Sequence, residues 1–192
     1  MKKLKIRNYD DKDFLWIENL MLESFPIAER PSKKQLQYLL SRENAIISII
    51  EKNNEKIGFL ISYDMRDFIF TDYLTIVPNM RNKGYGREIL KKAMTFLDKP
   101  LIFECETPSF SEMAKRRYSF YLKLGFFDYG INYKMPSLDI EEKPISMRLM
   151  GGNSRIEDEQ LDDLIRTLYT KVYSHVIDFP QNQLLLENLY IN

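Results

Sequence analysis

Three strand-like runs follow one another closely in the first half of the chain, and they constrain its fold more than any other feature. They are AIISIIEK (45–52), KIGFLISYD (56–64) and FIFTDYLTIV (68–77). The connecting segments NNE and MRD are short enough for hairpins, so the runs predict an antiparallel meander. Their apolar stretches are longer than strict alternation gives, which predicts central strands that are covered on both faces.

Helices and further strands are predicted on both sides of this meander. A strand and two helices precede it, and alternating helices and strands follow it, which is typical of an α/β (α+β) fold with a mixed, mostly antiparallel central sheet flanked by helices. The elements predicted before the meander are a strand over 3–9 and helices that begin at Asp10 or Asp11 and at Ser32. Those after it are a helix ending at Asp98, a strand over 101–106, a helix from Ser111 to Leu124, and a strand pair formed by 126–129 and 146–150.

The C-terminal segment is predicted to be an appendage to this fold. GGNS (151–154) has the composition of a linker, so the chain divides into a domain over 1–150 and a C-terminal helical extension over 151–192. The extension contains an amphipathic helix whose apolar stripe must be buried, either against the same chain or in a homodimer. The apolar tail 183–191 needs a partner as well, and His175 fits the role of a cation at the C-terminal end of the helix. The stripe comprises Leu161, Leu164, Ile165, Leu168, Tyr169, Val172 and Tyr173.

The charge balance and the scarcity of reactive side chains exclude several classes of protein. The 192 residues include 28 Lys and Arg against 28 Asp and Glu, with one His and one Cys. These counts exclude a His/Cys zinc site and a disulfide framework, and zero net charge argues against general binding of nucleic acid. No stretch approaches the ~20 apolar residues of a membrane span, and the basic N-terminus lacks the apolar region of a signal peptide. We therefore expect a cytoplasmic protein without metal, nucleic-acid or membrane partners, whose chemistry uses carboxylates, tyrosine hydroxyls or backbone amides.

A glycine-bearing turn after the third run is the strongest functional signal in the sequence. The strand DYLTIV (72–77) is followed by PNM and then by RNKGYGREILKKAM (81–94). The start of a helix presents unpaired N–H groups and the positive end of the helix dipole, and glycines let an anion approach closely. The turn therefore predicts a pyrophosphate cradle, with ordinary turn chemistry as the alternative. It has neither the Gly-Lys-Ser/Thr ending of a Walker loop nor the third glycine of a Rossmann fingerprint.

The turn and a second segment downstream share a pattern with a known family. In RNKGYG, Arg81, Gly84 and Gly86 match the pattern Arg/Gln-x-x-Gly-x-Gly/Ala. In SFYLKLGFF (119–127), Tyr121 and the Gly-Phe pair that follows it match Tyr-x-x-x-Gly-Phe. These patterns, their separation of 40 residues and the order of elements over 3–150 resemble the GNAT superfamily of acetyl-CoA-dependent N-acetyltransferases.

The resemblance implies acetyl-CoA as co-substrate and assigns residues to it. The backbone amides of the turn would hold the pyrophosphate, and the edge of the preceding strand, at Ile76 and Val77, would pair with the pantetheine arm. Tyr121 would be the general acid that protonates the departing thiolate, although a core aromatic is the alternative for this residue. The turn residues assigned to the cofactor are Arg81, Asn82, Lys83, Gly84, Tyr85, Gly86 and Arg87.

The general base and the acceptor contacts are less sharply defined. Glu104 and Glu106 alternate with apolar residues on one strand, and Asp72 lies on the strand across the expected slot. Carboxylates on central strands are costly to bury, which makes them functional candidates. Glu104 is the favoured base, while Asp72, Glu106 and Glu29 are assigned to acceptor binding. The alternatives are that Glu106 merely ends its strand, that Asp72 pairs with a neighbouring Lys or Arg, and that Glu29 lies in a solvated turn.

The sequence leads to a hypothesis about the reaction and leaves the acceptor open. By resemblance, the chain transfers an acetyl group from acetyl-CoA to a primary amine by direct attack, and the acceptor is a small molecule or a peptide. The alternatives are a non-catalytic acyl-CoA sensor or interaction module on the same fold, and an unrelated α/β binding protein whose turn is structural. The chain departs from the family where many relatives have Asn and a small residue, since it has Ala114 and Arg117 there. Arg116 and Arg117 would then face the CoA phosphates or the solvent.

Overall fold

The computed structural model describes residues 4–187 and is built on one eight-stranded sheet with the order β1-β2-β3-β4-β5-β8-β6, in which β7 also pairs with β8. Every pairing is antiparallel except that of β4 with β5. The mixed, mostly antiparallel sheet predicted from the sequence is therefore confirmed. The strands are β1 (Lys5–Asn8), β2 (Ala45–Lys52), β3 (Glu55–Asp64), β4 (Ile69–Ile76), β5 (Leu101–Glu106), β6 (Phe127–Asp128), β7 (Tyr133–Met135) and β8 (Ile145–Gly152).

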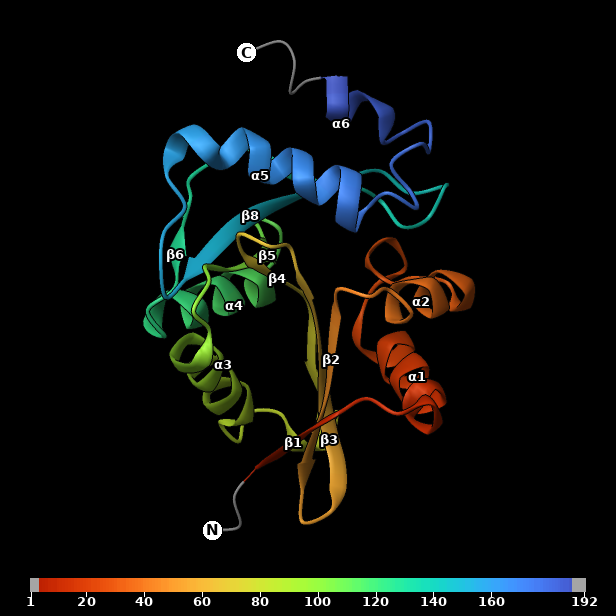
Figure 1. Ribbon diagram of the computed structural model, residues 1–192, viewed down its shortest axis with the longest axis vertical. Coiled ribbons are helices and arrows are strands. Elements are labelled where there is room, and N and C mark those ends of the chain that lie inside the picture. Colours follow the sequence, from red (N-terminus) through yellow and green to blue (C-terminus); the bar gives the residue numbers. More distant parts are fainter. Residues whose placement is uncertain (1–3, 188–192) are drawn as a thin grey trace.

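Helices flank the sheet on both sides. Figure 1 shows α1 (Phe14–Ser24) and α2 (Lys33–Leu40) on one side, with α3 (Tyr85–Phe96) and α4 (Glu112–Lys123) on the other. The helix α5 (Leu161–Thr167) crosses the end of the molecule above β8 and continues into the π-helical segment η5 (Leu168–Val172). Shorter elements are η1 (Asp11–Asp13), η2 (Ile27–Glu29), η3 (Pro78–Met80), η4 (Asp158–Gln160) and α6 (Gln183–Glu187). No helix in residues 4–187 is long and apolar enough to cross a membrane.

Local signals in the sequence account for most of these boundaries. The side chains of Asp10 and Ser32 each form a capping box at the start of a helical segment, as predicted from their position before an apolar periodic run. The turn between β2 and β3 uses Asn53 and Asn54, both with positive φ, which suits the twist of a tight hairpin. The predicted hairpins and helix starts are therefore confirmed.

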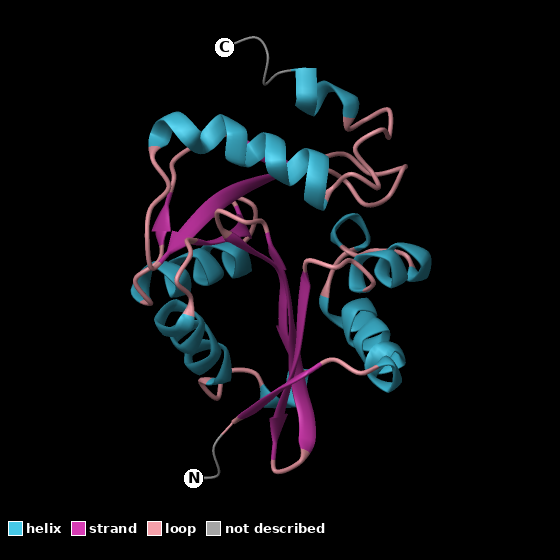
Figure 2. Cartoon of the chain, in the orientation of Figure 1, coloured by secondary structure: helices cyan, strands magenta, loops and turns pink. Residues whose placement is uncertain are grey.

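The strands β4 and β5 separate after a short parallel pairing. They pair only at Ile69↔Leu101, Phe70↔Ile102 and Thr71↔Phe103. Beyond this point β4 stays with β3, whereas β5 stays with β8 through Glu106. Figure 2 shows the magenta strands of the two halves diverging. The divergence opens a slot in the middle of the sheet.

The expected linker at 151–154 is wrong, because Gly151 and Gly152 belong to β8 and are buried. A Cβ on Gly151 would lie 2.4 Å from the Phe127 ring, and one on Gly152 would lie 2.4 Å from the Phe126 ring. The two glycines therefore leave room for the rings of Phe127 and Phe126 to pack directly against β8. The division into a domain over 1–150 and an extension over 151–192 stays a prediction, but its boundary falls within a strand.

The apolar stripe of the C-terminal extension is buried against its own chain. All seven of its predicted members belong to the same core cluster as the inner faces of β2, β3 and β4. The Tyr169 hydroxyl also donates to the Lys134 carbonyl at 2.8 Å. A homodimer stays a prediction and would need another surface.

His175 is not the expected cation, because burial and the nearby Arg42 charge lower its pKa to about 4. Residue 3 of the predicted first strand and residues 188–191 of the apolar tail lie outside the described residues.

We expect Gly58→Ala to destabilise the protein, because a Cβ at this position in β3 would lie 2.4 Å from the backbone oxygen of Thr75 in β4. The two strands would have to move apart, at a cost of about 1–3 kcal/mol in the free energy of unfolding measured with urea. Gly86→Ala is the matched control, since open space surrounds its Cβ position in α3. The control should leave the free energy of unfolding unchanged or raise it by up to about 1 kcal/mol. Equal effects of the two substitutions would contradict the close approach of β3 and β4.

Candidate active site

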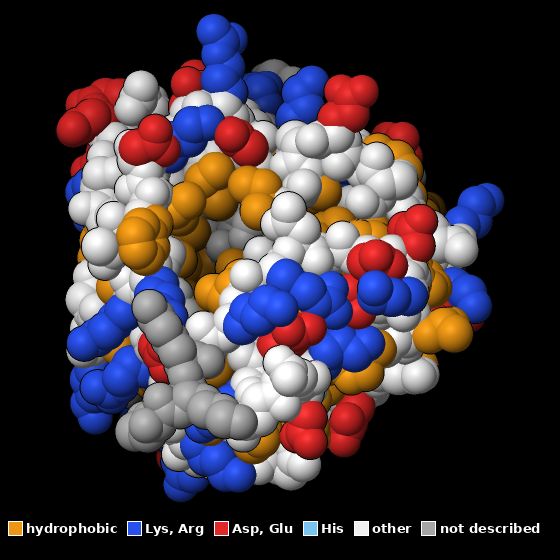
Figure 3. All heavy atoms as spheres, turned by 60° about the horizontal axis from the view of Figure 1, so that its bottom comes forward, with side chains coloured by type: hydrophobic (Ala, Val, Ile, Leu, Met, Phe, Trp, Pro, Cys, Tyr) orange, Lys and Arg blue, Asp and Glu red, His pale blue; other side chains and the backbone are white. Residues whose placement is uncertain are grey.

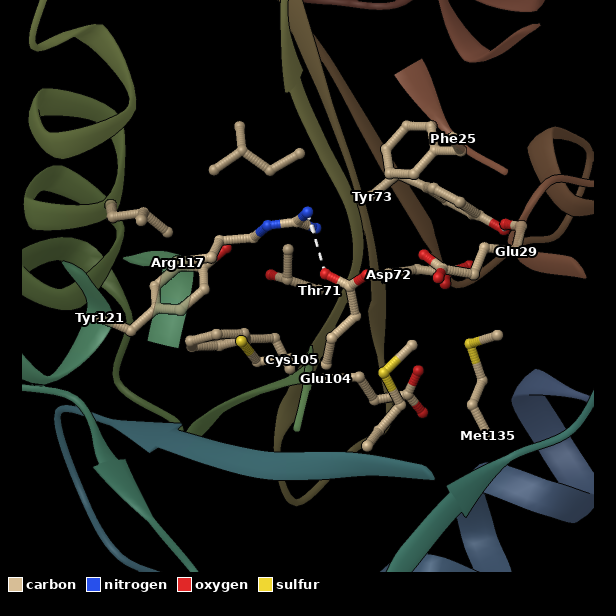
Figure 4. Close-up of a pocket in the computed structure, with 15 residues that line it drawn as sticks. Phe25, Glu29, Thr71, Asp72, Tyr73, Glu104, Cys105, Arg117, Tyr121 and Met135 are labelled. Atoms are coloured by element: carbon tan, nitrogen blue, oxygen red, sulfur yellow. Dashed lines mark hydrogen bonds and ion pairs between the residues drawn. The ribbon is translucent and has the colours of Figure 1, made fainter. Parts of the chain in front are cut away.

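A cavity lies where β4 and β5 separate, and it brings together five side chains that were predicted from the sequence to serve catalysis or acceptor binding. Figure 4 shows Glu29 entering from one side, Arg117 and Tyr121 from the opposite side, and Asp72 and Glu104 between them. These residues come from η2, α4, β4 and β5, which are far apart in the sequence. Phe25, Met135 and Met147 add an apolar part to the lining. The five predicted residues are Glu29, Asp72, Glu104, Glu106 and Tyr121.

The Glu104 carboxylate accepts a hydrogen bond on each of its oxygens. The Tyr133 hydroxyl donates to Oε1 at 2.5 Å, and the Tyr173 hydroxyl donates to Oε2 at 2.7 Å. Burial raises the pKa of Glu104, the two hydroxyls lower it, and the result is about 7. A carboxyl with this pKa is well suited to exchange a proton near neutral pH.

Sequence reasoning missed both of these tyrosines. Tyr133 begins β7, which has only the three residues YKM and gave no recognisable strand pattern. Tyr173 was assigned to the apolar stripe, and its ring does pack there. The only available signal was the hydroxyl itself, because a buried tyrosine normally needs a hydrogen-bond partner.

The pKa values of Asp72 and Glu29 are also raised above those of ordinary carboxyl groups. Burial raises the pKa of Asp72 well above its usual range, and the charge of Glu104 raises it further. Burial, together with the charge of Glu106, raises the pKa of Glu29 to about 7. Glu29 and Glu104 therefore titrate near neutral pH, and the pKa of Asp72 is shifted in the same direction. The burial of Glu29 does not fit the alternative of a solvated turn.

Glu106 forms an ion pair with Arg117. The Arg117 guanidinium lies 2.9 Å from Oε2 of Glu106, and this is the dashed line in Figure 4. Glu106 is buried and Arg117 is partly exposed at the edge of the cavity. The structure thus directs Arg117 to a carboxylate, whereas the sequence led us to expect that it faces CoA phosphates or solvent.

Tyr121 is both a packed aromatic residue and part of the cavity lining. Its ring packs against Phe103, with 4.5 Å between ring centroids, and against Phe126. The same residue lines the cavity opposite the carboxylates. Burial raises the pKa of Tyr121 above its ordinary value, so its hydroxyl stays protonated across the physiological range. Its role as an acid stays a prediction.

The glycine-bearing turn lies at the far end of β4. Asn82 and Gly84 have positive φ, residues 81–84 are exposed, and α3 begins at Tyr85. Open space surrounds the Cβ positions of Gly84 and Gly86. Exposed amides at the start of a helix, without side chains in front of them, fit a pyrophosphate group.

Ile76 and Val77, at the end of β4, were both expected to pair with the pantetheine arm, but only the backbone of Ile76 faces the slot. The Val77 N–H donates to the Ile57 carbonyl, so it faces β3. Alternation along the strand then turns the backbone of Ile76 toward the slot. The Ile76 carbonyl accepts from Arg81 Nε at 2.8 Å, and Arg81 also donates to Ser24 Oγ at 2.9 Å. Arg81 therefore ties the turn to the strand and to α1.

Positive charge gathers beside this turn. A second hollow lies between the start of α3 and α4, and its lining includes Arg87, Lys115, Arg116 and Lys123. Figure 3 shows a deep hollow with a hydrophobic lining, and Lys and Arg side chains lie on the surface around it. In residues 4–187 no group of three or more His, Cys, Asp or Glu side chains is arranged to hold a metal ion.

The comparisons with known proteins agree with this geometry. Residues 43–127 match the sequence model of the acetyltransferase (GNAT) domain. The chain is 26% identical over 163 residues to YjbC of Bacillus subtilis (strain 168), which carries an acetyltransferase assignment; the match covers 83% of this chain and 82% of YjbC. A solved GNAT-family structure from Bacteroides thetaiotaomicron superposes with a TM-score of 0.81 at 29% identity, covering 88% of this chain and 98% of its own. Arabidopsis thaliana NAA60 in complex with acetyl-CoA shares the fold, with a TM-score of 0.58, 12% identity and coverage of 78% and 97%.

Fold and sequence together define an acyltransferase enzyme. Residues 43–127 match the GNAT acetyltransferase domain, and the chain is similar in sequence and fold to GNAT acetyltransferases. This similarity does not support the alternative of an unrelated binding protein, and the role of the turn stays a prediction.

We expect Glu104→Gln to flatten the dependence of stability on pH. The folded protein keeps the Glu104 proton up to about pH 7, whereas the unfolded chain loses it near 4.5, so the free energy of unfolding falls as pH rises through this window. Removing this group should reduce the fall by up to about 3 kcal/mol, as measured by urea unfolding at pH 5, 6, 7 and 8. Asp72 and Glu29 will keep part of the slope. Glu112→Gln, at an exposed position in α4, should retain the wild-type slope, and an equal slope in E104Q would contradict the burial of Glu104.

Proposed function

We propose that this chain transfers an acetyl group from acetyl-CoA to a primary amine by direct attack. The observation that carries the proposal is the shared cavity, in which an acid candidate, Tyr121, lies opposite a carboxyl, Glu104, whose pKa is about 7. The GNAT domain match supports acetyl transfer in general. The solved structure of NAA60 is a complex with acetyl-CoA, which supports this co-substrate for the fold.

The proposed position of acetyl-CoA follows the slot. Its pyrophosphate would lie on the exposed amides of residues 81–87, and the basic hollow beside α3 would take the nucleotide end. Its pantetheine arm would run along β4 from Ile76 toward Asp72, a distance of roughly 13 Å at 3.3 Å per residue. The thioester would then arrive in the cavity between Tyr121 and Glu104. Acetyl-CoA supplies the activated acyl group, so no metal or nucleophilic cysteine is required.

The proton transfers are assigned to two side chains. A cationic acceptor first releases one proton to solvent. The neutral amine nitrogen then forms a bond to the thioester carbonyl carbon, and the bond between that carbon and sulfur breaks. Glu104, as carboxylate, accepts the proton that the amine loses, and Tyr121 gives its hydroxyl proton to the departing thiolate. The proton on Glu104 returns to Tyr121 through solvent, which restores both groups. The Tyr121 hydroxyl is protonated when the thiolate leaves, as this role requires, and the raised pKa makes it a weaker acid than an exposed tyrosine.

The acceptor is proposed to be an amine on a small molecule or a peptide. It would enter between η2 and the open end of the cavity, where Glu29, Glu106 and Asp72 surround it. Carboxyl groups at this position favour a cationic amine over a neutral or anionic acceptor. A non-catalytic acyl-CoA sensor gains no support from a cavity that holds both an acid and a base candidate.

We expect Tyr121→Phe to lower kcat by about 10²-fold or more while leaving the Kd for acetyl-CoA within a fewfold of wild type. A panel of amines with a thiol-release readout identifies a working acceptor, and calorimetry measures acetyl-CoA binding. Tyr118→Phe is the control, because Tyr118 lies on the same helix and donates instead to Asp128 at 2.8 Å. If Y121F and Y118F have the same kcat as wild type, Tyr121 is not the acid.

We also expect kcat/KM to rise with pH along an acid limb with a pKa near 7, since Glu104 must be ionised to act as a base. Glu104→Gln should remove this limb and most of the activity. Glu29 titrates in the same range, so Glu29→Gln is the discriminating variant. It should retain the limb, moved slightly to lower pH, because the Glu29 charge raises the pKa of Glu104. Loss of the limb in E29Q and its survival in E104Q would reassign the base to Glu29.

A further inference from the structure

The C-terminal extension supplies one of the two hydroxyls that hold Glu104. Tyr173 follows the π-helical segment η5 and donates to Glu104 Oε2 at 2.7 Å. The other donor, Tyr133, begins β7. Both residues lie beyond residue 127, where the match to the GNAT domain ends. The cavity is therefore completed by parts of the chain that lie outside the matched domain.

A widened helical turn precedes Tyr173, whose hydroxyl reaches Glu104. The Tyr173 N–H donates to the Leu168 carbonyl, five residues earlier, at 3.0 Å. Such π-helical turns are rare and occur often at functional sites. Tyr173 is only 2% exposed, and its hydroxyl reaches a carboxylate across 69 residues of sequence. The irregular turn thus lies directly before the residue that donates a hydrogen bond to Glu104.

Other contacts anchor the extension independently of this hydroxyl. Tyr169 donates to the Lys134 carbonyl at 2.8 Å and stacks on Tyr133 with an interplanar angle of 20°. The fully buried Asn182 donates to the carbonyls of Ser137, at 3.0 Å, and Val176, at 2.8 Å. Removing the Tyr173 hydroxyl should therefore leave the extension in place.

We propose that Tyr173 is a positioning residue for acetyl transfer, and that its hydroxyl holds the Glu104 carboxylate in the orientation and the charged state that a general base needs. The proposal rests on the proposed function, in which Glu104 takes the proton from the amine. It makes the C-terminal extension a part of the active site, in addition to its place in the core.

The groups around Glu104 determine how strongly Tyr173 acts on it. They are Asp72 and Tyr73 from β4, Glu29 from η2, Tyr133 from β7, and Tyr169 and Tyr173 from the extension. Among the described residues, the only side chains that donate hydrogen bonds to this carboxylate are Tyr133 and Tyr173. A hydroxyl donor favours the charged form of a carboxyl, whereas burial and the charges of neighbouring acids favour the neutral form. Loss of one donor should raise the pKa of Glu104 by about one to two units.

The experiment compares Tyr173→Phe with Tyr169→Phe in the full chain. Both substitutions remove one buried hydroxyl from the same extension, but only the first removes a contact with Glu104. In Y173F the acid limb of kcat/KM should move up by about one to two units, which lowers kcat/KM about five- to fiftyfold at pH 7 and restores it to within about twofold by pH 9. In Y169F the limb should stay at the wild-type pH. A purely structural defect would lower the rate at every pH and would leave the limb in place.

A second readout does not depend on turnover. Titration of the 13C-labelled Glu104 side chain by NMR, assigned with E104Q, measures its pKa directly in each variant. A higher pKa in Y173F than in wild type and Y169F supports the positioning role. An unchanged pKa, or an equal change in Y169F, overturns it. If the pKa moves but wild type transfers no acetyl group to any amine tested, the contact stands and the proposed function fails.

Discussion

The short parallel pairing of β4 and β5 is the constraint on which the rest of the structure depends. After Thr71 and Phe103 the two strands have different partners, and neither can close the slot between them. Helices flank the sheet on both sides (Figure 1), and the side chains at the slot line a cavity. A continuous sheet would have filled this space with apolar side chains. The divergence instead leaves room for polar groups in the centre of the molecule.

Burying carboxyl groups in such a space costs free energy of folding, and each of these carboxyls has different partners. Glu104 receives two tyrosine hydroxyls, and Glu106 receives the Arg117 guanidinium. Burial and the charge of Glu104 raise the pKa of Asp72 well above its usual range. Environments that push the pKa values of neighbouring acids apart are what allow one carboxyl to act as a base while another stays neutral. The same burial that lowers the stability of the protein thus also sets the pKa values on which acid–base chemistry depends.

The sequence predicts those parts of the fold and site that depend on local signals. The hairpins, the caps at Asp10 and Ser32 and the turn before α3 all follow from residues close together in the chain. Five of the residues predicted to serve catalysis or acceptor binding meet in one cavity. The failures lie where distant segments meet. Gly151 and Gly152 resemble a linker until the rings of Phe126 and Phe127 are placed over them.

His175 and Tyr173 show the same limit of local reasoning. His175 resembles a helix-end cation, but tertiary packing buries it beside Arg42 and keeps it neutral. Tyr173 fits the apolar stripe by its ring, and no sequence pattern reveals that its hydroxyl meets a strand 69 residues away. Helical periodicity identifies which face is buried, but it does not identify the polar atom that this face must satisfy.

The two uses of the C-terminal extension cannot be separated by removing it. Its apolar stripe is part of the main core, and β8 runs two residues into the segment that was expected to be a linker. A chain ending at residue 150 would lose Gly151 and Gly152 from the sheet and would expose the core, so any loss of activity would report unfolding. Single hydroxyl deletions avoid this problem because they leave the rings in place. Stability and the charge state of Glu104 can then vary independently, although in the intact protein the same helix supports both.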